Sequence, residues 1–158
     1  MVYSMSGSIN IQDGRVRQYT MGMIEDVVTY LDANSTSFAA GTNLFAHTMP
    51  ETTVTTCAIF ERQSVEPVRR MSTGNTVQKH TIQLFVRSTV PAGGESIPIP
   101  TASRAKADTA WEILDRVTNA TISGTTYLRI EPLFAPFEAA RDERGRIIFS
   151  FSAIVWRA

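Results

Sequence analysis

The alternation of apolar and polar residues is clearest in the last third of the chain, where it predicts two strands. Residues 126–130 and 146–156 are rich in β-branched and aromatic side chains, and residues 141–145 form a polar break between them. Every other residue of the second strand is apolar, so we expect one face of it to be buried, namely Ile147, Phe149, Phe151, Ala153 and Val155. The opposite face is mixed, and we expect it to meet a helix, a loop or another subunit over part of its length.

Two other segments carry apolar residues at helical spacing. The first is predicted to start near Met23 and to end at Asn34, with Thr20 as its cap and Met23, Ile24, Val27, Val28 and Leu31 as its apolar set. The second is predicted over residues 102–119, with Thr101 as its cap. The apolar set of this second helix is Ala105, Ala110, Trp111, Ile113, Leu114 and Val117.

Three segments between these helices have the composition of strands, and they cover residues 44–49, 52–61 and 77–89. The last of them alternates most regularly, with His80, Ile82, Leu84 and Val86 on one face. Residues 62–76 contain a proline and a glycine and show no period, so we predict a long connection there.

This order of elements predicts an α+β domain of two layers, a mainly antiparallel sheet with two packed helices. Pro132 and Pro136 interrupt the C-terminal hairpin, so we expect the segment between its strands to be a bulged or edge piece. Phe134 and Phe137 in this segment would then be exposed and form an interaction surface.

The first twenty residues differ from the rest, because they contain several Ser and Gly residues and no sustained period. We predict that residues 1–20 form a flexible arm, or an extended segment that orders only against a partner. Residues 21–158 are then a single domain, long enough to bury a core without a disulfide or metal.

Charge and composition narrow the function classes. Lys and Arg total 15 and Asp and Glu total 15, so the formal net charge is zero, which argues against sequence-specific binding of nucleic acid. The sequence shows no apolar run long enough to cross a membrane and no secretory leader, so we expect no membrane partner. The single cysteine, Cys57, suits a reducing compartment.

The residues that commonly carry chemistry are few and scattered. His47, His80 and Cys57 stand on separate predicted elements, which disfavours a metal site, and no phosphate-binding loop or cofactor motif occurs. We interpret His80 as a satisfied core or strand-end histidine and Cys57 as a small buried residue. Catalysis by Cys57 with one of the histidines in a small cytosolic enzyme remains an alternative, although nothing in the sequence orients a base.

Arginines gather in two places, Arg62, Arg69 and Arg70 in the long connection and Arg141, Arg144 and Arg146 at the C-terminal turn. Acidic residues lie among both groups, which weakens an interpretation as a nucleic-acid surface. We favour solvated loop tips, with contacts to another protein as the functional alternative.

Five segments carry a resemblance to a known family: the helix over residues 21–31, the loop over 65–70, the strand over 78–87, the helix over 107–114 and the closing strand over 147–155. Their order and size resemble the tail terminator proteins, also called tail completion or minor tail proteins, of long-tailed, siphovirus-type bacteriophages. The resemblance covers residues 21–158, and the leading arm departs from the family pattern.

The resemblance implies a structural virion protein without a catalytic site or cofactor. Members of that family form a six-membered ring that caps the tail tube, stops tube polymerisation and presents a surface to the connector or neck protein. This implies a place at the head-tail joint of the virion, after assembly in the cytoplasm of the bacterial host, with DNA able to pass through the ring lumen. Loops and hairpin ends make the ring contacts in the family, which points here to Arg69, Arg70, Arg141 and Arg144. A neck or stopper protein of the head-tail connector is the alternative within the same class.

Overall fold

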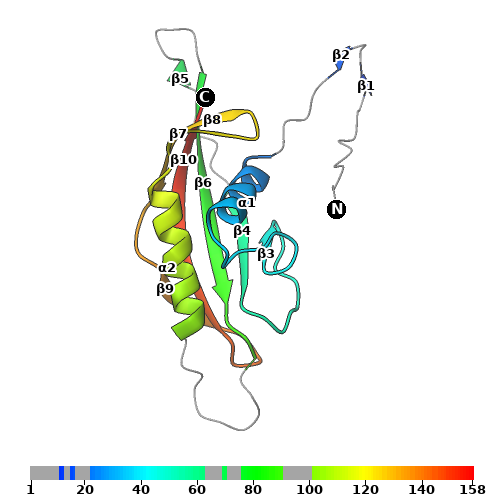
Figure 1. The fold of residues 1–158 in the computed structure, drawn as a ribbon, viewed down its shortest axis with the longest axis vertical. Helices are drawn as coiled ribbons and strands as arrows, with labels where there is room; N and C mark the ends of the chain where they lie inside the picture. The colour runs from blue at the N-terminus through cyan, green and yellow to red at the C-terminus, as the bar shows by residue number, and fades with distance from the viewer. Residues whose placement is uncertain (1–10, 13–14, 17–21, 63–68, 71–75, 91–100) are drawn as a thin grey trace.

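The computed structural model describes residues 11–12, 15–16, 22–62, 69–70, 76–90 and 101–158 (Figure 1). Most of the predicted N-terminal arm and the predicted cap Thr20 lie outside these residues. Within the arm, β1 (Ile11–Gln12) pairs antiparallel with β2 (Arg15–Val16). The flexibility of the arm therefore stays a prediction.

Helix α1 spans Met23–Asn34 and buries the predicted apolar set. Its N-cap residue is Gly22, which is extended and gives no side-chain cap, while Glu25 and Asp26 lie in the first turn, where acidic residues complement the helix dipole. The helix ends at Asn34 as predicted, and the Asn34 side-chain amide donates to the Tyr30 carbonyl at 2.7 Å.

One large sheet forms the body of the protein, in the order β3-β4-β6-β10-β8-β7. Among the named strands of the described residues, the β3–β4 pair alone is parallel, and the pairs β4–β6, β6–β10, β8–β10 and β7–β8 are antiparallel. The bounds are β3 Leu44–Ala46, β4 Thr56–Arg62, β6 Thr76–Arg87, β7 Thr118–Ile122, β8 Thr125–Pro132 and β10 Ile147–Arg157. Two short strands complete it, β5 (Arg69–Arg70) on β6 and β9 (Phe137–Arg141) on β10.

The C-terminal hairpin differs from the prediction in which strands it joins. The turn after Arg141 connects β9 to β10, whereas β8 pairs with the far half of β10, from Ala153 to Arg157. β8 and β9 thus lie one after the other along the same side of β10, and the proline-containing segment 133–136 separates them. Proline cannot donate to a ladder, which explains why the strand is interrupted there.

Helix α2 spans Thr101–Asp115, so its predicted end at residue 119 is wrong. Residues 118–122 form β7 instead, because their β-branched side chains suit a strand and the turn at Ser123 and Gly124 folds them onto β8. Both turn residues have positive φ, 49° and 83°, as a two-residue hairpin turn requires. Val117 is still buried, although it lies in the connection rather than in the helix.

A single apolar core lies between one face of the sheet and both helices (Figure 1). The predicted faces of β6 and β10 point into it, as Ile82, Leu84 and Val86 of β6 and the odd-numbered residues 147–155 of β10 are buried. α2 faces the sheet with small residues, Ser103, Ala107 and Ala110, followed by Leu114, and Ala105 of the predicted set is exposed. The α+β class and the mainly antiparallel sheet are thereby confirmed. The sheet is curled, and a strict two-layer arrangement stays a prediction.

Candidate functional site

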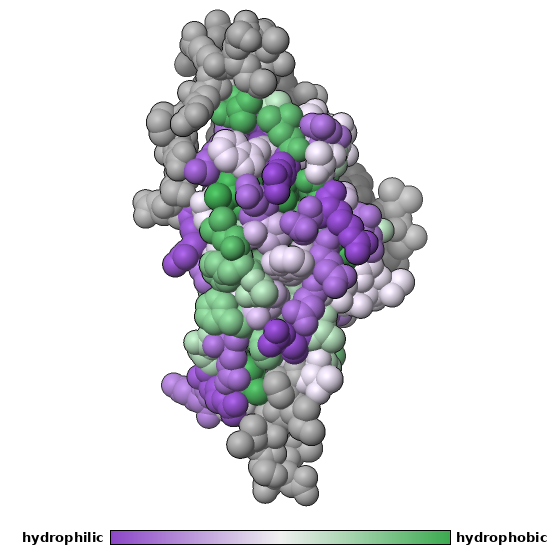
Figure 2. Space-filling view, turned by 90° about the vertical axis from the view of Figure 1, so that its left-hand side faces the viewer, coloured by the Kyte–Doolittle hydropathy of each residue, from purple (hydrophilic) through white to green (hydrophobic). Residues whose placement is uncertain are grey.

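The segment between β8 and β9 carries an exposed apolar patch. Leu133, Phe134 and Phe137 are 49%, 44% and 47% exposed, and the rings of Phe134 and Phe137 lie 5.5 Å apart between centroids. Figure 2 views the side of the molecule that carries α2 and β9, and it shows hydrophobic residues in a column beside a hydrophilic surface. The exposure predicted for Phe134 and Phe137 is therefore confirmed, while their role in partner contact stays a prediction.

This patch is held in place by the elements around it. The Leu133 backbone N–H donates to the Ser152 carbonyl at 2.9 Å, and the Trp111 indole N–H of α2 donates to the Phe134 carbonyl at 3.0 Å. Pro136 between the two aromatic residues is buried. An apolar surface fixed in this way loses little conformational entropy on binding, which favours its use as an interface.

The predicted arginines lie at opposite ends of the sheet (Figure 1). Arg69 and Arg70 pair with the first two residues of β6, whereas Arg141 pairs with Ile147 at the start of β10, near the last residues of β6. β6 has 12 residues, and at a rise of about 3.3 Å per residue its ends lie roughly 35 Å apart. The two arginine groups therefore lie at opposite ends of one subunit.

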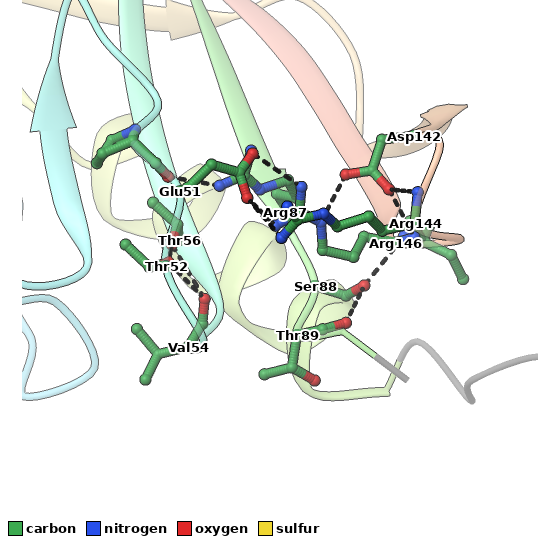
Figure 3. Close-up of polar contacts among 12 residues, drawn as sticks. Glu51, Thr52, Val54, Thr56, Arg87, Ser88, Thr89, Asp142, Arg144 and Arg146 are labelled. Atoms are coloured by element: carbon green, nitrogen blue, oxygen red, sulfur yellow. Dashed lines mark hydrogen bonds and ion pairs between the residues drawn. The ribbon is translucent and has the colours of Figure 1, made fainter. Parts of the chain in front are cut away.

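A network of charged residues occupies the end of the sheet near the C-terminal turn (Figure 3). Arg146, only 3% exposed, donates through its two terminal nitrogens to the two carboxylate oxygens of Glu51, at 2.9 and 3.0 Å. Its Nε donates to Asp142, and Arg87 reaches the Pro50 carbonyl and Glu51. These contacts fasten the loop before β4 to the turn before β10.

Arg144 and Glu51 are the exposed members of this network, whereas Arg87 and Arg146 are buried. The Arg144 side chain is 62% exposed, and its one described contact, to Glu51, is long at 3.4 Å. The backbone N–H groups of Arg144 and Arg146 donate to Asp142 Oδ1 at 2.9 and 3.0 Å, which fixes the turn. An open hollow lies beside it, lined by Arg141 and Ile148 among others.

Sequence reasoning missed Glu51 and Arg87 as members of this network. Glu51 lies 95 positions from Arg146 and 36 from Arg87, so no local pattern links them. The sequence offers one signal for buried ion pairs, namely that charged residues stand at the ends of apolar strands. Arg87 ends an otherwise alternating strand, and Arg146 precedes an apolar one. The pairing depends on β6 and β10 lying side by side.

The network makes stability depend on pH. The hydrogen bond from Arg146 lowers the pKa of Glu51 below 4.5. Burial raises the pKa of Asp142, but hydrogen bonds from Arg146 and Arg144 outweigh burial and lower this pKa below 3.8. Both carboxylates bind protons less tightly in the folded protein than in the unfolded chain. Each therefore contributes fully to the free energy of unfolding above its ordinary pKa, and this contribution is lost as the pH falls through the lowered pKa of the folded state. We expect the Tm of Glu51→Gln to fall less steeply than that of the wild type between about pH 5 and about pH 3.

Thermal unfolding monitored by circular dichroism across this pH range tests the expectation. Glu112→Gln is the control, because Glu112 lies on the exposed side of α2, 3.9 Å from Arg116. Identical acid profiles for Glu51→Gln and the wild type would show that the network contributes nothing to acid sensitivity.

The outer face of the sheet, opposite the core, carries an uncharged row that is apolar except for Ser150. Residues paired in register across it are Phe45, Ala58, Phe85, Ser150 and Phe137. None of them is charged, and among the described residues both helices pack on the other face. The row leads directly to the exposed Phe137 at the sheet edge. The expectation that this face of β10 meets another element or subunit stays a prediction.

The structure argues against Cys57 as a nucleophile. The side chain is fully buried, and burial raises the pKa of its thiol to about 12. His47 contacts Glu25 at 3.0 Å and His80 contacts Glu61 at 2.7 Å, so each imidazole has a carboxylate partner rather than the thiol. His80 is thus satisfied as predicted, although it lies within β6 rather than at a strand end.

We therefore expect Cys57 to react with iodoacetamide at neutral pH only when the protein unfolds, because the reactive thiolate is both rare and inaccessible. Mass spectrometry of labelling with and without denaturant measures this. Rapid labelling of the folded protein would contradict the buried position.

No group of three or more His, Cys, Asp or Glu residues in the described part of the chain is placed to hold a metal ion. None of the described helices has the length and apolar character needed to cross a membrane.

Comparison with known proteins places the fold. No protein-family model matches the chain, and no curated protein matches its sequence. Its structure is similar to that of a chain in the virion of a native gene transfer agent particle, with a TM-score of 0.54 and 12% sequence identity. The match covers 85% of this chain and 93% of that one. The fold of this protein is thus similar, over most of its length, to that of a virion component.

Proposed function

We propose that this protein is a structural virion component, a tail terminator at the head-tail joint of a long-tailed bacteriophage. The observation that carries the proposal is the fold shared with a virion chain over most of both lengths. The exposed Phe134 and Phe137 and the surface charges of Arg141 and Arg144 support it, since they suit contacts with other subunits.

In this proposal the two-layer domain of residues 21–158 forms a hexameric ring, and residues 1–20 form an arm. Tail tube subunits end on one face of the ring, and a connector or neck protein docks on the other. Arg69 and Arg70 at one end of β6, and Arg141 and Arg144 near the other, are candidates for different contacts because they lie far apart. The mechanism is steric: the ring occupies the growing end of the tube and offers no further site for a tube subunit.

A neck or stopper protein is the second candidate, because the same fold similarity to a virion chain supports any structural role in the particle. The enzyme alternative is disfavoured by the buried, protonated thiol of Cys57.

Electron microscopy of particles produced from a phage genome that lacks this gene tests the proposal. We expect detached heads and tails of uncontrolled length, because nothing then ends tube growth. Tails of normal length that fail to join heads would instead indicate a neck protein. Intact infectious particles would refute a structural role.

A further inference from the structure

Strand β9 is an edge strand, and one of its two sides has no strand partner among the described residues. Its other side pairs with β10. All five residues, Phe137–Arg141, are exposed. Edge strands of this kind present free backbone N–H and C=O groups that another strand can pair with.

A β-bulge gives β9 an unusual charge arrangement. The register against β10 shifts so that Glu138 lies opposite Phe149 and Ala140 lies opposite Ile148, which leaves Ala139 as the extra residue. Residues three apart on a regular strand point to opposite faces, but the bulge places Glu138 and Arg141 on the same face. Their side chains consequently meet, with Arg141 Nε 2.9 Å from Glu138 Oε1.

We propose that β9 is a self-pairing strand, through which two copies of this chain join their sheets edge to edge around a two-fold axis. Antiparallel pairing about the Ala139–Ala140 centre sets Glu138 of one copy opposite Arg141 of the other, and the same pair recurs by symmetry. Two alanines at the centre allow the backbones to approach closely. The opposite charges at equal distances from that centre identify a second copy as the partner.

The same pairing uses the remaining exposed groups near the edge. Because the strands are antiparallel, the turn that carries Arg144 in one copy lies beside Phe134 and Phe137 of the other. The largely exposed Arg144 guanidinium can then stack on an aromatic face. The two-fold axis also keeps the outer faces of both sheets on one side.

This contact goes beyond the proposed function and does not depend on it. Subunits in a closed ring meet through head-to-tail contacts, whereas self-pairing of β9 is isologous. The two can coexist, as a dimer that precedes ring assembly or as two rings joined face to face. The outcome of the gene deletion therefore tests the terminator function and not the β9 contact, and the dimerisation of the purified protein tests the β9 contact and not the terminator function.

Sedimentation velocity of the purified full chain tests the contact. We expect the wild type to dimerise, and Glu138→Arg or Arg141→Glu alone to raise the dimer dissociation constant about tenfold or more, because each change places like charges opposite each other twice. The double variant Glu138→Arg with Arg141→Glu restores both pairs and is expected to dimerise like the wild type. All four residues involved are exposed in one copy, so the fold is retained, and circular dichroism checks this.

Matched controls separate pairing from general charge effects. The exposed pair of Glu112 on α2 and Arg116 just after it, 3.9 Å apart, receives the same reversal, which is expected to leave the dimer unchanged. Ala140→Cys is expected to form cross-linked dimers with a short bismaleimide, whereas Ala33→Cys on the exposed side of α1 is not. The native Cys57 is buried, so we expect it not to react with the cross-linker in the folded protein.

Three results would overturn the proposal. If the wild type sediments as a monomer, the bulge and the charged residues of β9 protect this edge strand from pairing. A double variant as weak as the single ones would rule out direct Glu138–Arg141 contacts between copies. A ring that falls directly to monomers in the single variants, without a dimer or a smaller ring, would replace the two-fold contact with a head-to-tail one.

Discussion

Tyr127→Phe is expected to lower the free energy of unfolding by about 3 kcal/mol, although it removes only one oxygen atom. The Tyr127 hydroxyl donates to Asp26 Oδ2 across 101 residues of sequence, and both side chains are fully buried. Asp26 Oδ1 has no hydrogen-bond partner in the described part of the chain. Without the hydroxyl, both oxygens of this buried carboxyl are unsatisfied, which is costlier than the loss of an exposed hydrogen bond. Urea unfolding measures the change.

A double-mutant cycle separates the hydrogen bond from packing. Asp26→Leu alone removes the carboxylate to which the Tyr127 hydroxyl donates, and Asp26→Leu with Tyr127→Phe removes both polar groups. We expect the double variant to lose less stability than the sum of the single losses, by at least about 1 kcal/mol. Strict additivity would show that the two side chains do not interact in the folded protein. Burial and the Asp26 contact also raise the pKa of Tyr127, so its ultraviolet titration is expected to be shifted upward in the wild type.

Phe151→Ala is expected to lower the free energy of unfolding by about 3 to 5 kcal/mol, a large fraction of the stability of a typical domain. Phe151 is buried on the core face of β10, paired with Leu84 of β6. β10 pairs with β6, β8 and β9, so a cavity here weakens the strand that holds the sheet together. Chemical denaturation and expression level report the loss.

Ile154→Ala is the matched control on the same strand. Ile154 lies on the outer face and is half-buried, so its truncation leaves little cavity and is expected to cost roughly 1 kcal/mol. Equal losses for the two variants would contradict the assignment of one buried and one open face to β10.

Local patterns predicted the elements whose signal lies in neighbouring residues. The helical spacing from Met23 to Leu31 and the alternation in β6 and β10 gave the correct elements and the correct buried faces, because burial of an apolar face is required wherever the rest of the chain runs. Prolines on both sides of Phe134 likewise predicted the interruption and exposure of that segment.

Predictions failed where two distant segments decide the outcome. The composition of residues 116–119 is compatible with a helix as well as with a strand. In the structure they form a connection and the start of β7, because β8 lies beside them and pairs with β7. The C-terminal hairpin joins β9 rather than β8 to β10, since the interrupted segment places both strands along one side of β10. Pairing energy between segments outweighed local propensity in each case.

The sequence by itself determined the α+β class, the core-facing positions of the long strands and the exposed aromatic pair, since each follows from residues a few positions apart. Only the tertiary structure decided the partners of buried polar groups. Glu51 meets Arg146, and Asp26 meets Tyr127, because the sheet brings remote segments together, and a buried charge or hydroxyl must find its partner wherever the fold provides one. The bulge that aligns Glu138 with Arg141 is likewise a property of the pairing between β9 and β10, and no spacing along the chain encodes it.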